Sequence, residues 1–140
     1  TLPWVATIDQ FQHWLYLNPG HTLDERRTAW NRIFDTFADT VTDWSSLQEA
    51  KDYLWQKQLH LYEVPFYYIE YGMAQLGAIA VWRNFRNDPA SGLRGYQNAL
   101  KLGYLRSIPE IYEAAGIKFD FSRDYIKELM NFVRAELKKI

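Results

Sequence analysis

Apolar residues recur three and four positions apart along almost the whole chain. Ile8, Phe11 and Leu15 form one such series, and Ile126 and Leu129 begin another. This spacing places side chains on one face of an α-helix, whereas a half-buried strand would alternate apolar and polar residues, and no segment does so convincingly. We therefore predict an all-α fold, a single helical domain of about seven helices.

Capping signals give the limits of the expected helices. Thr22 and Glu25 have the spacing of a capping box, as do Ser107 and Glu110. Pro65 suits the first turn of a helix, where a missing N–H costs nothing. The sequence predicts helices over residues 4–17, 22–37, 46–59, 65–87, 88–102, 107–116 and 122–137.

The composition excludes several classes of protein. The 140 residues carry a formal net charge of −1 with acidic and basic residues interspersed, so we expect no nucleic-acid partner. Cysteine is absent, which excludes disulfides and fits a reducing compartment, and we expect a cytoplasmic protein. The most apolar stretch, 69–82, is interrupted by Glu70, Gly72 and Gln75, so we expect no membrane partner.

The segment His60-Leu-Tyr-Glu-Val-Pro-Phe-Tyr-Tyr-Ile-Glu-Tyr71 holds one histidine, four tyrosines and two carboxylates within twelve residues. It precedes a stretch of small and apolar residues, 72–82, which is typical of a buried helix. Hydroxyl groups at the start of such a helix need hydrogen-bond partners. Either they bond to the rest of the fold, or they face a cavity in which a polar ligand binds.

Four segments of the chain resemble the C-terminal part of the catalytic domain of oligoendopeptidase F-like zinc peptidases, relatives of thimet oligopeptidase. In chain order they are Ala6–Tyr16, His60–Trp82, Asn98-Ala-Leu-Lys-Leu-Gly103 and Ile108-Pro-Glu-Ile-Tyr-Glu-Ala-Ala-Gly116. The resemblance implies a helical fold with a deep channel. It also implies that residues 1–140 form the C-terminal helical section of that catalytic domain.

In this family, zinc is held by the two histidines of a His-Glu-x-x-His helix and by a glutamate of a following helix. The chain contains no His-Glu-x-x-His, and His13, His21 and His60 are too far apart in sequence for that pairing. The resemblance therefore implies that the zinc ligands lie outside this chain, in a preceding part of the same peptidase. It also implies that the chain by itself is inactive.

The resemblance further implies roles for individual residues. A histidine and tyrosines at this place in the family line the substrate cleft and hydrogen-bond the substrate and the oxyanion that forms at the scissile carbonyl. The matching positions are His60 and Tyr71 as catalytic residues and Tyr67 and Tyr68 as substrate-binding residues. Which tyrosine stabilises the oxyanion stays open. By the helical period, Tyr67 and Tyr71 share one face of the expected helix.

Three hypotheses account for these features. The first is a zinc metallo-oligopeptidase, a metalloendopeptidase of the oligoendopeptidase F type, which hydrolyses short peptides and to which this chain contributes the substrate-binding wall. The second is a non-enzymatic helical module that binds a peptide in an aromatic groove. The third is an inactive fragment. Under all three, His13 is expected to be structural and His21 to be solvated.

Overall fold

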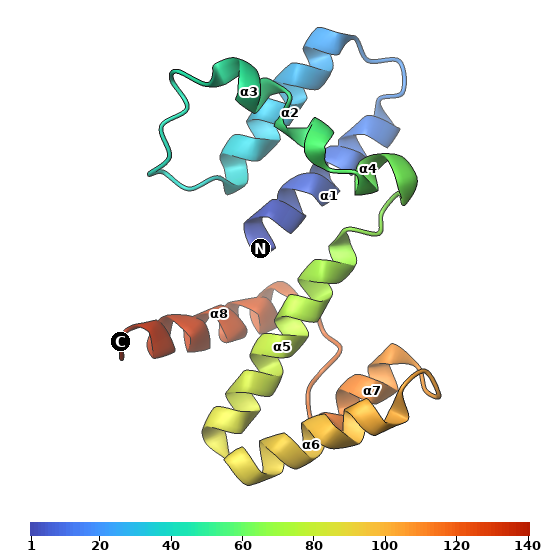
Figure 1. Ribbon diagram of the computed structural model, residues 1–140, viewed down its shortest axis with the longest axis vertical. Coiled ribbons are helices and arrows are strands. Elements are labelled where there is room, and N and C mark those ends of the chain that lie inside the picture. The colour runs from blue at the N-terminus through green and yellow to red at the C-terminus, as the bar shows by residue number, and fades with distance from the viewer. The chain divides into compact units, whose positions relative to one another are not determined.

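The computed structural model describes all residues from Thr1 to Ile140 and contains eight α-helices, one 3-10 helix and no strand, so the all-α prediction is confirmed (Figure 1). By their contacts the residues divide into two compact units, Thr1–Gly72 and Met73–Ile140, where the sequence led us to expect one helical domain. The elements are α1 (Leu2–Leu17), α2 (Leu23–Phe37), α3 (Gln48–Asp52), η1 (Leu54–Lys57), α4 (His60–Glu63), α5 (Ile69–Asn87), α6 (Pro89–Leu102), α7 (Ile108–Ala114) and α8 (Arg123–Leu137).

Five of the seven expected helices form close to the predicted limits, and at the starts of α2, α6 and α8 the capping side chain acts as the sequence indicates. At the start of α2, Thr22 and Glu25 form both bonds of a capping box. The Thr22 backbone N–H and hydroxyl both donate to the Glu25 carboxylate, at 2.8 and 2.9 Å, and hold the pKa of this carboxyl below its usual value. At the start of α6, the Asp88 carboxylate accepts from the N–H groups of Ala90 and Ser91, each at 3.1 Å.

The expected helix over residues 46–59 is wrong, because the chain leaves the α-helical path after Asp52 and continues as η1. In a continued α-helix the carbonyl of Lys51 would accept from the N–H of Trp55. Here that carbonyl accepts from the indole Nε1–H of Trp30 at 2.7 Å, and the Trp55 ring is buried in the core. A tertiary hydrogen bond thus replaces the helical one.

The expected start of a helix at Pro65 is also wrong, because α5 begins at Ile69. Phe66 has a left-handed backbone conformation with φ of 60°, which no α-helix can contain. Its backbone N–H donates to Oε1 of Gln12 at 2.9 Å. Tyr67 and Tyr68 therefore precede α5, and the expectation that Tyr67 and Tyr71 share a helix face is wrong.

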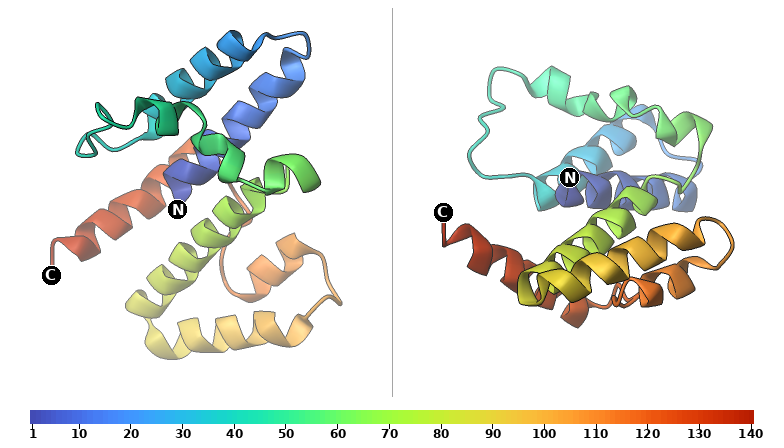
Figure 2. Two further views of the ribbon diagram at one scale, coloured as in Figure 1. Left: turned by 45° about the horizontal axis from the view of Figure 1, so that its top comes forward. Right: turned by 60° about the horizontal axis from the view of Figure 1, so that its bottom comes forward.

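The first unit is built around the pair α1 and α2, which lie side by side in every view (Figure 1, Figure 2). The Phe11 ring meets the Trp30 ring edge to face, with centroids 5.1 Å apart. Each fully buried side chain of this kind contributes roughly 2 kcal/mol to the free energy of unfolding. The buried core cluster consists of Ile8, Phe11, Trp30, Ile33, Phe34 and Trp55.

The second unit depends on glycines that let helices approach closely. A Cβ atom at Gly92 of α6 would lie 2.7 Å from the Phe85 Cα of α5, and one at Gly95 would lie 2.9 Å from the Ala115 carbonyl oxygen. The pair α6 and α7 lies side by side in Figure 1 and Figure 2. Helix α8 is joined to α5 by the ion pair between Arg83 and Glu128 at 2.6 Å.

No helix combines the length and the apolar character that crossing a membrane requires.

Replacing Gly92 with alanine tests this packing. The added Cβ would lie 2.7 Å from the Phe85 backbone, so α5 and α6 must move apart, and we expect the free energy of unfolding to fall by about 1–3 kcal/mol. Gly20→Ala is the matched control, because a Cβ at Gly20 meets no atom within 4 Å. Urea denaturation of both variants measures the difference, and equal stability of the two would contradict this packing.

Candidate functional site

The turn between α4 and α5 brings His60 and Tyr71 together. His60 is the first residue of α4, and Tyr71 lies in the first turn of α5. The backbone reverses between them through the left-handed residue Phe66. As a result, His60 Nε2 lies 3.2 Å from the Tyr71 hydroxyl oxygen, within hydrogen-bonding distance.

All four site residues expected from the sequence lie in one aromatic cluster. The Tyr68 ring meets the His60 ring edge to face, with centroids 4.9 Å apart. The Tyr67 ring is parallel to that of His60 at 6.2 Å, and the Tyr71 ring is nearly perpendicular to it at 5.5 Å. The structure therefore groups these residues, although Tyr67 and Tyr68 belong to the turn and not to a helix.

The three tyrosines differ in how far they are exposed to solvent. Tyr67 is 43% exposed and Tyr71 is 44% exposed. Tyr68 is partly buried and packs against the core of the first unit. The Tyr67 and Tyr71 side chains are therefore available to a ligand, while Tyr68 also supports the His60 ring from the core side.

Gln12, which is not among the site residues expected from the sequence, holds the turn in place. Gln12 is 2% exposed, and its Oε1 accepts the Phe66 N–H. The Phe66 ring packs against His13 and Tyr16 of α1, with centroids 4.9 and 5.0 Å away. The sequence does contain a signal, since Gln12 is a polar residue at helical spacing from Ile8 on a buried stripe.

Gln58, which is also not among the site residues expected from the sequence, lies beside His60. Gln58 is 9% exposed, and its Oε1 accepts from the Trp4 indole Nε1–H at 3.0 Å. Its amide Nε2 lies 2.7 Å from His60 Nδ1. No local pattern marks this residue, because its position depends on the break between α3 and η1.

The remaining histidines hydrogen-bond to nearby backbone. Nδ1 of His13 lies 2.9 Å from the Asp9 carbonyl oxygen, and Nδ1 of His21 lies 2.5 Å from that of Asn18. No group of three or more His, Cys, Asp or Glu side chains lies close enough together to hold a metal ion. The residues of this chain therefore do not fit a zinc site by themselves.

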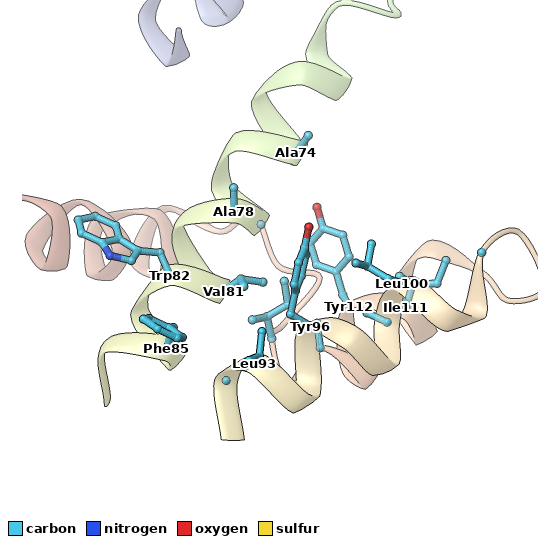
Figure 3. A pocket seen from close by; sticks show the side chains of 16 residues that line it. Ala74, Ala78, Val81, Trp82, Phe85, Leu93, Tyr96, Leu100, Ile111 and Tyr112 are labelled. Carbon is cyan, nitrogen blue, oxygen red and sulfur yellow. The ribbon is translucent and has the colours of Figure 1, made fainter. Parts of the chain in front are cut away.

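The second unit contains a separate apolar cavity of about 670 Å³ between α5, α6 and α7 (Figure 3). Val81, Tyr96 and Tyr112 are among its lining residues. The Tyr112 hydroxyl donates to the Met73 carbonyl at 3.1 Å, and burial raises the pKa of this phenol. No lining residue is a carboxylate, lysine, arginine or histidine, so the phenols of Tyr96 and Tyr112 are the ionisable side chains of the lining.

The chain matches the family model of peptidase family M3 over residues 1–131. It is also similar to two solved structures. One is a provisionally assigned oligoendopeptidase F, with a TM-score of 0.82 and 31% sequence identity. The other is PZ peptidase A with an inhibitor, with a TM-score of 0.87 and 26% identity. Each match covers 99% of this chain but 25% of the solved chain, so the chain spans about a quarter of their length. No curated protein matches.

Replacing Gln12 with methionine tests whether the buried amide holds the turn. Methionine has a similar volume but no oxygen, so the Phe66 N–H loses its acceptor. We expect the Phe66 amide to exchange with solvent roughly five- to tenfold faster, as measured by hydrogen exchange. Gln10→Met is the control, since Gln10 is exposed on the same helix. Unchanged exchange at Phe66 would show that Gln12 is dispensable there.

Proposed function

Because the chain belongs to peptidase family M3, we propose that it is part of a metallopeptidase that hydrolyses short peptides. The 31% identity to an oligoendopeptidase F supports an endopeptidase of that type. In this proposal, zinc is held by residues outside this chain, in the preceding part of the same peptidase, because the chain itself forms no metal site. The contribution of residues 1–140 is to bind the peptide and to stabilise charge on it.

The pair of His60 and Tyr71 is the observation that carries this proposal. Their polar atoms are 3.2 Å apart, and Tyr71 is exposed to solvent. Hydrolysis of a peptide bond passes through a tetrahedral intermediate whose former carbonyl oxygen becomes negatively charged. A fixed donor aimed at that oxygen lowers the barrier, and a phenol can donate without placing a permanent charge in the cleft.

The neighbouring tyrosines are assigned to substrate binding. Tyr67 is exposed, and its ring lies 5.9 Å from that of Tyr71, so a peptide that reaches Tyr71 also passes Tyr67. Its hydroxyl can donate to a peptide carbonyl or accept from a peptide N–H. Tyr68 is assigned to the same surface, with a smaller contribution because it also packs against the core.

Replacing Tyr71 with phenylalanine in the intact peptidase tests the catalytic assignment. The change removes the hydroxyl and keeps the ring, so we expect kcat to fall roughly 100-fold while KM changes little. Tyr62→Phe is the matched control, because Tyr62 is exposed and its ring stacks on Trp55 at 6.2 Å without contributing to the cluster around His60. If steady-state hydrolysis of a fluorogenic peptide shows the same kcat for Tyr71→Phe and the wild type, Tyr71 is not a catalytic residue.

Metal removal distinguishes a metallopeptidase from a non-enzymatic peptide-binding module. The same exposed tyrosines would suit either protein. For a metallopeptidase we expect about one zinc ion per molecule of the intact protein. We also expect a chelator to abolish hydrolysis and added zinc to restore it. Metal analysis with peptide hydrolysis assays measures both. A metal-free protein that still binds peptides and never cleaves them would favour the module instead.

A further inference from the structure

We propose that Gln58 is a positioning residue that fixes the tautomer of His60 and thereby keeps the hydroxyl proton of Tyr71 free for the substrate. The inference rests on the proposed function in its last step alone. Three hydrogen bonds within the first unit connect four side chains in series, those of Trp4, Gln58, His60 and Tyr71.

The Trp4 indole determines which way the Gln58 amide faces. An indole N–H can donate a hydrogen bond and cannot accept one. Trp4 Nε1 lies 3.0 Å from the Gln58 side chain, so the atom facing it must be the amide oxygen. The amide nitrogen therefore faces His60. Gln58 is 9% exposed, so solvent offers little competition for either bond.

The direction of the Gln58 amide then determines which nitrogen of His60 carries the proton. The amide nitrogen of Gln58 is a donor and lies 2.7 Å from His60 Nδ1. Any form of His60 with a proton on Nδ1 would set two donors against each other. Nδ1 must accept, so the proton of the neutral ring is on Nε2.

The His60 tautomer in turn determines what the Tyr71 hydroxyl can do. With its proton on Nε2, His60 donates to the Tyr71 oxygen at 3.2 Å. Tyr71 then accepts from His60 and keeps its own proton for another acceptor. In the opposite tautomer, Nε2 would be an acceptor and would take the Tyr71 proton as its hydrogen-bond partner. Three successive bonds thus leave the Tyr71 proton free for an acceptor other than His60.

Gln58→Glu tests this sequence of bonds with almost no change in shape. A carboxylate can still accept from Trp4, but it can no longer donate to His60. We expect the neutral ring of His60 to move its proton to Nδ1. In NMR spectra of protein labelled with ¹⁵N-histidine, recorded at alkaline pH, the shifts of the two ring nitrogens report which one is protonated. The His60→Gln spectrum assigns the signals.

Kinetics of the same variants show whether the tautomer matters for hydrolysis. At the alkaline pH used for the spectra, we expect Gln58→Glu to lower kcat roughly 100-fold with little change in KM, because Tyr71 then donates to Nε2 of the neutral His60 ring. Adding Gln58→Glu to Tyr71→Phe should lower kcat no further, since both changes remove the same donor. Gln56→Glu is the matched control. Gln56 is exposed, and this substitution adds the same negative charge two residues away from Gln58.

The outcomes separate this inference from the proposed function. If His60 keeps its proton on Nε2 in Gln58→Glu, the inference is overturned, whatever the kinetics. If the proton moves and kcat falls only in Tyr71→Phe, the inference is also overturned, while the catalytic role of Tyr71 stands. If the proton moves and kcat is unchanged in both variants, the proposed function of Tyr71 fails, and the inference fails with it.

Discussion

The hydrogen bond from the Phe66 N–H to the buried Gln12 side chain is the interaction on which the arrangement of the candidate site depends. A helix running without interruption from His60 to Tyr71 would separate these residues by roughly 16 Å along its axis. The left-handed turn at Phe66 reverses the chain instead and leaves their polar atoms 3.2 Å apart. Such a conformation costs a bulky residue about 1–2 kcal/mol, which the hydrogen bond and the ring contacts of Phe66 offset.

Helix α1 anchors both ends of this arrangement. Trp4 holds Gln58, and Gln12 holds Phe66; each of these hydrogen bonds joins residues 54 positions apart in sequence. Trp4 and Gln12 are eight residues apart on α1, so they share a helix face with Ile8. That face is buried against α2, which fixes the orientation of α1. The apolar core therefore positions two polar anchors that the site requires.

The buried amide of Gln12 carries an energetic cost. Its Oε1 is satisfied by Phe66, but its Nε2 is buried and has no hydrogen-bond partner. A buried donor without a partner costs about 1–3 kcal/mol. An apolar residue would avoid this cost and would leave the Phe66 N–H without its acceptor. The turn that this bond holds carries the residues proposed to contact the peptide.

The sequence by itself determined the all-α fold and the helix limits at Thr22, Asp88 and Ser122, and its family resemblance indicated four residues of the candidate site. The fold class and the helix limits depend on local spacing and on capping bonds between residues two or three positions apart. The tertiary structure alone decided where the helix expected over residues 46–59 is interrupted, where α5 begins and which glutamines face the turn. Those outcomes depend on hydrogen bonds across 21 to 54 positions, from Trp30 to Lys51, Trp4 to Gln58 and Phe66 to Gln12. A distant donor or acceptor displaces a local one only when the core has brought them together, and local sequence does not contain that distance.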